Sequence, residues 1–187
     1  MTSILKVSEI QDPTNSNTAL TIDSSGQVSV TKPLSGSTSV AFIADEKANT
    51  VEGGTFSSGA WRTRDLNTEV FDPDGIVSIS SNQFTLGAGT YLLQVKAPAY
   101  RVGRNRARVY NVTDSVEEGI SNSAFEDTDN DGTSLIEITA LVTPTSSKTY
   151  EIQHRCLVSQ STYGFGVASD IGSGNERYTT VFITKLA

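Results

Sequence analysis

An acidic stretch in the second half of the chain has the spacing of a calcium-binding loop. Its carboxylates stand at alternate positions, at Asp127, Asp129 and Asp131, and a glycine follows them. Carboxylates at this spacing can converge on a hard cation, and the glycine allows a tight turn. The twelfth position should be a bidentate acid but is Ile138, and Glu137 stands one place early, on the opposite strand face. Two interpretations stay open: a calcium site, or an acidic, solvated hairpin tip without any cofactor.

A row of arginines precedes this loop. Arg104, Arg106 and Arg108 recur at every second position, so they share one face of a predicted strand, and Arg101 lies just upstream. Guanidinium groups in a row can hold sulfated, phosphorylated or carboxylated glycans through bidentate hydrogen bonds. They can equally pair with acids across a subunit boundary, since the chain has 21 acidic and 14 basic residues. The row is therefore a candidate ligand-binding site with a structural alternative.

The only histidine and the only cysteine lie two residues apart, at His154 and Cys156. A His–Cys nucleophile pair needs its side chains within hydrogen-bond reach, whereas Cα atoms at this spacing on a strand are about 6.5–7 Å apart. No third member of a catalytic site is evident. We expect a hydrogen-bonded core histidine beside an inert thiol.

The aromatic residues are candidates for stacking on sugar rings, with core packing as the alternative for each. They are Trp61, Tyr100, Tyr163 and Phe165. Tyr163 and Phe165 lie in a glycine-rich loop, so we expect these two to be exposed and to contact a ligand. A polysaccharide-degrading enzyme would instead need paired carboxylates in a cleft, and the acids between Asp114 and Asp131 cluster in one loop. The sequence therefore predicts a binding protein and not an enzyme.

Composition limits the class of protein that carries these residues. The 187 residues suffice for one domain and an appendage, and only 36% of them are hydrophobic. A net charge of −7 argues against nucleic-acid binding, and one cysteine excludes an intrachain disulfide. No apolar run approaches the ~20 residues of a membrane helix, and the first residues lack a signal-peptide pattern. We expect a protein made in a cytoplasm, with part of its core supplied by further copies of the chain.

The elements that would position these residues are short strands. The glycine-bearing turn at 87–89 leads into a strand in which Tyr91, Leu93 and Val95 share an apolar face. No stretch shows a convincing helical period. The expected strands of the head domain, residues 38–187, are 39–44, 76–79, 83–86, 90–95, 106–112, 134–142, 149–158 and 178–186. About eight strands separated by turns indicate an all-β jelly-roll β-sandwich.

Residues 1–37 differ from the rest because they contain no aromatic residue. Their apolar positions form short runs, with candidate contacts at Ile4, Leu5, Val7, Ile10, Leu20 and Ile22. Turn-forming stretches separate the runs, so we expect two or three short strands that cannot make a core alone. The alternative is a flexible tail. We interpret residues 1–37 as an N-terminal β arm that anchors the head to a partner.

Residues 38–187 resemble the trimeric jelly-roll heads of the tumour necrosis factor and complement type, in the version found on phage fibres and other virion proteins. The stretches that carry this resemblance are AWRTRDLN (60–67), QFTL (83–86), GTY (89–91), AYR (99–101), ARVYNV (107–112), EIQHRC (151–156), GFG (164–166) and VFITKL (181–186). In the arm, ILKV (4–7) and ALTIDSSG (19–26) are similar to the starts of marine phage structural proteins.

The resemblance implies a homotrimer on the virion surface, made in the host cytoplasm and without catalytic activity. Its implied role is a tail fibre or spike head that binds host surface glycan. The chain lacks the long repetitive shaft of a typical fibre, which raises the alternative of a capsid decoration protein. In that case the arm would grip the major capsid protein.

Overall fold

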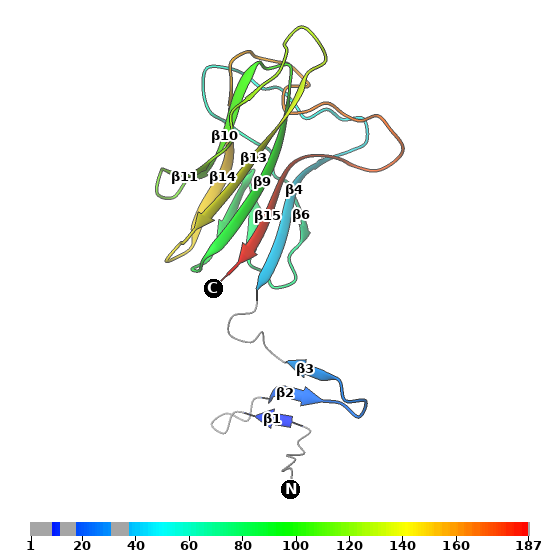
Figure 1. Cartoon of the computed structure of the whole chain (residues 1–187), viewed down its shortest axis with the longest axis vertical. Coiled ribbons are helices and arrows are strands. Elements are labelled where there is room, and N and C mark those ends of the chain that lie inside the picture. Colours follow the sequence, from blue (N-terminus) through cyan, green and yellow to red (C-terminus); the bar gives the residue numbers. More distant parts are fainter. Residues whose placement is uncertain (1–8, 12–17, 31–37, 187) are drawn as a thin grey trace. The chain divides into compact units, whose positions relative to one another are not determined.

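The computed structural model describes residues 9–11, 18–30 and 38–186 (Figure 1). The chain divides into two compact units, Met1–Ser37 and Thr38–Ala187, which are described separately. The described residues form strands, turns and loops, and they contain no helix that is long and apolar enough to cross a membrane.

The first unit contains a three-stranded antiparallel sheet in the order β1-β2-β3. Its strands are β1 (Glu9–Gln11), β2 (Thr18–Ile22) and β3 (Val28–Val30). The β2–β3 turn is closed by Asp23, whose carboxylate accepts the backbone N–H of Ser25 at 2.9 Å and of Gln27 at 2.8 Å. Ile10 pairs with Leu20 in the ladder, whereas the predicted contacts Ile4, Leu5 and Val7 lie outside the described residues.

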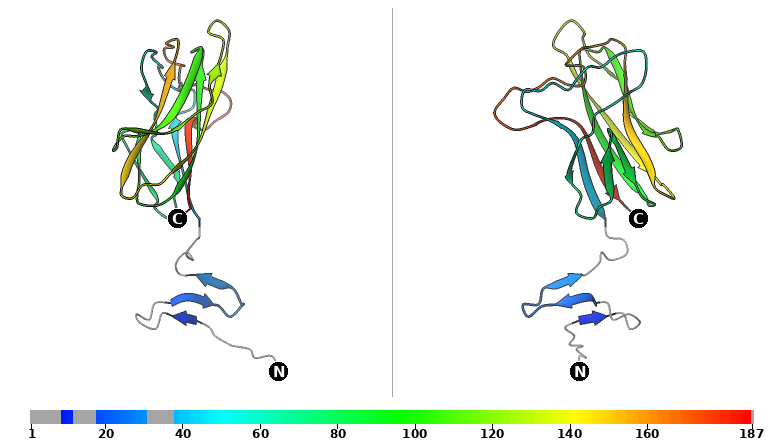
Figure 2. Two further views of the ribbon diagram at one scale, coloured as in Figure 1. Left: turned by 60° about the vertical axis from the view of Figure 1, so that its left-hand side comes forward. Right: turned by 180° about the vertical axis from the view of Figure 1, so that it is seen from behind.

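The head is a sandwich of two antiparallel sheets, and the two layers are visible in Figure 2. One sheet has the order β13-β9-β15-β4-β6. Its strands are β4 (Ser39–Lys47), β6 (Thr68–Phe71), β9 (Tyr91–Tyr100), β13 (Thr133–Val142) and β15 (Glu176–Lys185). The prediction of an all-β sandwich is confirmed.

The second sheet has the order β11-β10-β14-β8-β7, and β12 and β5 pair with β10 and β14. Its strands are β5 (Arg62–Thr63), β7 (Val77–Ser80), β8 (Gln83–Leu86), β10 (Arg104–Asn111), β11 (Val116–Ile120), β12 (Ala124–Phe125) and β14 (Lys148–Cys156). Four of the head's strands were not predicted, namely β5, β6, β11 and β12. They are short and mostly exposed, so their sequences lack a clear apolar alternation.

The core lies between the two sheets and follows the strand period of two. Every second residue of β13 is buried, and Tyr91, Leu93 and Val95 of β9 are buried as predicted. Ile152 and Val109 close the core from the second sheet. The outward positions of both sheets are therefore free to differ in chemistry while the inward positions hold the sandwich together.

One end of the head holds the start of its first strand and the end of its last strand, and the other end holds its long loops. Ser39 at the start of β4 pairs with Lys185 at the end of β15, so the chain enters and leaves the head at the same end. The opposite end carries the turn between β9 and β10 and the loops 126–132 and 157–175 (Figure 1). The residues singled out in the sequence gather at this loop end or along the strands that lead to it.

Candidate ligand-binding site

The predicted arginine row lies on the outward face of β10. Arg104 and Arg106 are exposed and Arg108 is half-buried, while the alternating residues Asn105 and Ala107 are buried. The expectation that the three arginines share one strand face is therefore confirmed. Their surroundings nevertheless differ, because Arg108 has partners within the chain whereas Arg104 and Arg106 are exposed.

Arg108 is held by its own subunit. Its guanidinium lies over the rings of Trp61 and Tyr110, at 4.3 and 4.5 Å from the ring centroids. Its Nε donates a hydrogen bond to Gln153 at 2.7 Å, and Glu117 lies 3.4 Å away. These contacts fit the structural interpretation of this arginine, because few donors remain for a ligand.

Arg101 also serves the fold. It sits in the β9–β10 turn with a φ of 55°, and its Nε donates to the backbone carbonyl of Thr128 at 2.9 Å. A second donor reaches the carbonyl of Asp129 at 3.4 Å. Arg101 therefore fastens the acidic loop to the β9–β10 turn.

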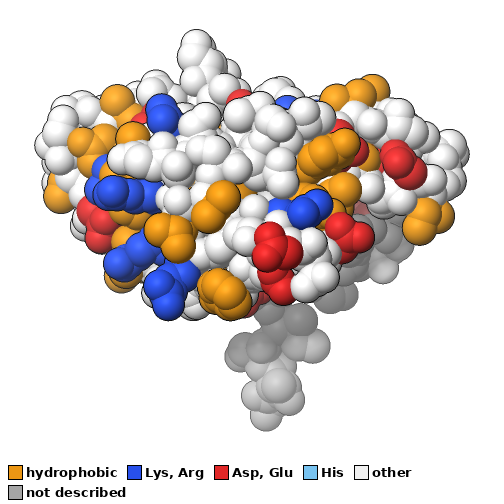
Figure 3. Space-filling model, turned by 90° about the horizontal axis from the view of Figure 1, so that it is seen from above, with side chains coloured by type: hydrophobic (Ala, Val, Ile, Leu, Met, Phe, Trp, Pro, Cys, Tyr) orange, Lys and Arg blue, Asp and Glu red, His pale blue; other side chains and the backbone are white. Residues whose placement is uncertain are grey.

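Arg155 of β14 joins the outward arginines. It is exposed and stands directly opposite Arg106 in the β10–β14 ladder. We call Arg104, Arg106 and Arg155 the arginine cluster. Among the residues that the structure describes, no carboxylate lies within 4 Å of any of the three. Figure 3 looks onto the loop end and shows basic side chains gathered along one side of the head, next to hydrophobic ones.

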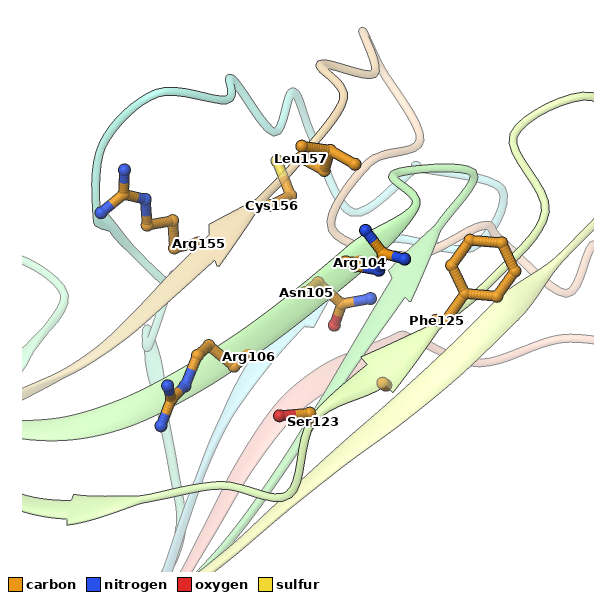
Figure 4. A pocket seen from close by; sticks show the side chains of 9 residues that line it. Arg104, Asn105, Arg106, Ser123, Phe125, Arg155, Cys156 and Leu157 are labelled. Atoms are coloured by element: carbon orange, nitrogen blue, oxygen red, sulfur yellow. The ribbon is translucent and has the colours of Figure 1, made fainter.

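A surface pocket of about 490 Å³ lies at the arginine cluster (Figure 4). Its lining consists of Arg104, Asn105, Arg106, Ser123, Ala124, Phe125, Arg155, Cys156 and Leu157. Phe125 is 72% exposed, and it faces Arg104 across the β10–β12 ladder. Leu157, at 60% exposure, forms the other apolar wall. The pocket thus combines three cations with apolar surface and has no acidic residue in its lining.

The acidic loop does not bring its carboxylates together. Asp127 accepts hydrogen bonds from the Asp129 backbone N–H at 2.9 Å and from the Asn130 amide at 2.6 Å, and Asp131 accepts the Tyr100 hydroxyl at 2.6 Å. The hydrogen bond from Asp129 is the largest cause of the lowered pKa of Asp127. Within the described ranges, no three Asp, Glu, His or Cys side chains are placed to hold a metal ion. The three carboxylates therefore do not fit a preassembled calcium site, and calcium binding stays a hypothesis.

His154 and Cys156 are core residues, as predicted. His154 is fully buried, and its Nε2 lies 3.0 Å from Oδ1 of Asn105. Burial lowers the pKa of His154 well below its ordinary value, and the charge of Arg64 adds to this. Burial raises the pKa of the Cys156 thiol to about 11, so the thiol is not a thiolate near neutral pH.

The two loop aromatics have different environments. Tyr163 is 41% exposed and lies edge-on to Tyr100, with the ring centroids 6.1 Å apart. The prediction that Phe165 is exposed is wrong, since it is only 8% exposed. Its ring packs on Phe56 at 4.6 Å and under the guanidinium of Arg64 at 4.2 Å, which removes it from any ligand surface.

Comparison with solved structures gives matches for the head's fold. The crystal structure of murine APRIL at pH 5.0 matches with a TM-score of 0.53 and 10% identity, over 80% of this chain and 100% of that chain. Murine APRIL at pH 8.5 gives a TM-score of 0.51 at the same identity and coverage. The globular domain of zebrafish complement 1qA protein matches at 0.48 and 13% identity, over 79% of this chain and 96% of that chain.

No family model and no curated protein matches the chain. The two murine APRIL matches and the two packed antiparallel sheets together show that the head has a jelly-roll fold. At this identity the likeness concerns the fold alone.

Of the residues that line the pocket, only Arg104 and Arg106 were predicted as ligand contacts, and the most important ones missed are Arg155 and Phe125. Arg155 lies on another strand than the arginine row, and only the β10–β14 register places it opposite Arg106. Phe125 lies on a two-residue strand that has no periodic signal. An exposed phenylalanine inside an otherwise polar loop was the one signal that could have indicated it.

Proposed function

We propose that this protein is a non-enzymatic, homotrimeric phage virion surface protein whose head is displayed on the particle and binds host surface glycan. The observation that carries the proposal is an uncovered apolar surface on the five-stranded sheet of the head. The outward residues that form this apolar face are Val40, Phe42, Phe71, Leu92, Leu141 and Phe182.

The apolar face consists of two neighbouring groups of apolar side chains, because Gln94 of β9 lies opposite Phe182 and Thr184 of β15 lies opposite Leu92. Phe42 of β4 pairs with Phe182 of β15 on one side and with Phe71 of β6 on the other. Leu92 of β9 pairs with Leu141 of β13, which is 58% exposed. Groups of exposed apolar side chains on one face mark interaction sites in soluble proteins.

A further copy of the same chain is the occupant that we propose for the apolar face. The lean hydrophobic composition of the chain is consistent with a core that is completed by self-association. A closed ring of three copies would cover this face in every subunit. It would leave the second sheet, with its arginine cluster, on the outside.

The virion assignment rests on the sequence resemblance of the head and of the arm to phage structural proteins. The His154–Cys156 pair, buried and with a raised thiol pKa, offers no nucleophile, which supports a binding role. The glycan ligand is supported by the unpaired arginine cluster beside exposed aromatic and aliphatic surface.

A capsid decoration protein is the second candidate. The observation that favours it is the separate three-stranded sheet of the first unit, which is followed by the head without an intervening repetitive shaft. In this role residues 1–37 grip the major capsid protein.

Cryo-electron microscopy of intact particles with a bound antibody fragment against the head tests the proposal. Fragment density at the tail supports a fibre or spike head, and density at capsomer positions supports decoration. Particles that carry no copy of the chain would refute the virion role.

A further inference from the structure

We infer that the pocket between β10, β12 and β14 is a subsite for an anionic sugar, one that carries a carboxylate or a sulfate group. The arginine cluster would hold the anion, and Phe125 would cover the sugar ring. This inference rests on the proposed glycan-binding function and assigns it a place and a ligand chemistry.

The first argument is the charge of the pocket. The chain has a net charge of −7, yet the pocket lining contains three arginines and no acid. Arg106 and Arg155 stand directly opposite each other, an arrangement that destabilises a sheet when both residues carry the same charge. The other outward arginine of β10, Arg108, has Glu117 and Gln153 as partners. An anion bound between Arg106 and Arg155 would offset their repulsion.

The second argument is the spacing of the arginine cluster. Residues directly opposite in an antiparallel ladder have Cα atoms about 4.5–5.5 Å apart. Residues two apart on a strand, such as Arg104 and Arg106, have Cα atoms about 6.5–7 Å apart. Three planar, forked donors therefore start from Cα positions within about 8 Å of one another. Guanidinium forks match the two oxygens of a carboxylate or sulfate.

The third argument is the apolar wall. The register of β10 and β12 places Phe125 beside Arg104, and Figure 4 shows its ring at the edge of the pocket. Phe125 and Leu157 are 72% and 60% exposed and line the same pocket, and exposed apolar residues that gather at one pocket indicate a binding site where single ones do not. A bare inorganic anion would leave this surface uncovered. A sugar offers both an anionic group for the arginines and an apolar ring face for Phe125.

The fourth argument is the rigid floor of the pocket. Asn105 lies beneath it and donates to Ser134 Oγ at 3.0 Å and to the carbonyl of Gly103 at 3.2 Å. Its Oδ1 lies 3.0 Å from His154 Nε2, so the side chain is engaged on both ends. The floor is thus fixed before a ligand arrives, which reduces the entropic cost of binding.

Isothermal titration calorimetry on the full chain tests the inference with three probes. Sialyllactose supplies a carboxylate, a sulfated galactose disaccharide supplies a sulfate, and lactose is the neutral control. We expect one or both anionic probes to bind, with an affinity that falls as salt rises. Which of the two binds identifies the anionic group.

The test variant is the double substitution Arg106→Gln and Arg155→Gln, and the matched control is Lys148→Gln. Lys148 lies on the same strand as Arg155 but already pairs with Asp114 at 2.6 Å. We expect the double variant to lose about tenfold or more in affinity for the anionic sugar, and the control to stay within about twofold. Phe125→Ala should weaken binding as well, without changing the salt dependence.

The possible results separate this inference from the proposed function. Unchanged anionic-sugar binding in the double variant would overturn the subsite, as would a wild-type protein that binds neither anionic probe. Binding of lactose alone would leave the glycan function standing and remove the anionic subsite. Circular dichroism melting and solution mass of each variant confirm that a loss of affinity is not a loss of folding.

Discussion

The two sheets of the head share one core but present opposite outward faces. The five-stranded sheet shows phenylalanine and leucine side chains, among them Phe71 at 51% exposure and Phe182 at 40%. The second sheet shows the arginine cluster, for which the described residues supply no carboxylate within 4 Å. Neither face contributes to the interior packing, so the sandwich itself does not require either composition. This difference is the basis of the two proposals, that a further copy of the chain covers one face and that the other face binds a ligand.

The largest expected effect comes from placing a charge on the apolar face. Phe182→Glu should convert the proposed trimer into a monomer, because three buried carboxylates would have no partner at the subunit boundary. Light scattering should fall from three times the 19.9 kDa chain mass to one. The matched control is Leu157→Glu on the arginine side, which should leave the mass unchanged. If both variants had the same solution mass, the two faces would not differ in their part in self-association.

Arg64 is a buried arginine, and its contribution to stability can be compared with that of the exposed arginine cluster. It is fully buried and donates to Thr179 Oγ1 at 2.7 Å and to the carbonyls of Pro98 at 3.0 Å and Phe165 at 2.9 Å. Burial lowers the pKa of its guanidinium to about 9, so it remains charged at neutral pH.

We expect Arg64→Met to reduce the free energy of unfolding by about 3 kcal/mol, because it leaves these buried acceptors without donors. Arg106→Met on the arginine cluster should change it by about 0.5 kcal/mol or less, and in the stabilising direction. Urea unfolding of both variants measures the contrast. If Arg64→Met left the free energy of unfolding unchanged, the buried arginine would not be needed for stability.

A smaller effect should appear on acidification, through His154. Its pKa is lowered in the folded state by burial and by Arg64, whereas the unfolded chain takes up a proton near the ordinary value of 6.5. The stability that neutral His154 provides is therefore complete above pH 6.5 and is lost as pH falls below it. The slope is at most about 1.4 kcal/mol per pH unit.

His154→Gln should flatten this slope between about pH 7.5 and 5.5, as measured by urea unfolding at each pH. Below that range Asp45 and Glu126 act in the opposite direction, because burial raises the pKa of both. An identical slope in wild type and His154→Gln would place the pH dependence elsewhere.

The smallest expected effect concerns the acidic loop, which lies at the loop end and belongs to neither face. Because Asp127 and Asp131 are turned to other partners, calcium and chelator should leave the melting temperature unchanged. A calcium-dependent rise in melting temperature that Asp129→Ala removes would contradict this and establish the calcium hypothesis.

The sequence predicted local features of both faces well. The period of two correctly turned Arg104 and Arg106 outward and Tyr91 and Leu93 inward, because strand alternation is a local property. The same alternation placed His154 in the core. The all-β class and the sandwich followed from the spacing of such stretches.

The predictions that failed concern contacts between residues that are far apart in the sequence. Phe165 looked exposed in its glycine-rich loop, but Arg64 and Phe56, about a hundred positions away, bury it. Arg108 looked equivalent to Arg106 in the sequence, but Trp61, just before β5, and Gln153 of β14 contact only Arg108 of the two. The pocket itself depends on the β10–β14 register, which no local pattern encodes.

The central claim is that one face is covered and the other is open, and thiol labelling tests it most directly. The native Cys156 is buried with a raised pKa, so it contributes little background. Gln94→Cys places a thiol in the middle of the five-stranded sheet's outward side, and Ser123→Cys places one at the pocket, both at exposed positions of the isolated chain. In the native protein, maleimide should modify Ser123→Cys rapidly and Gln94→Cys only after denaturation. Rapid labelling of both thiols in the native protein would contradict the account.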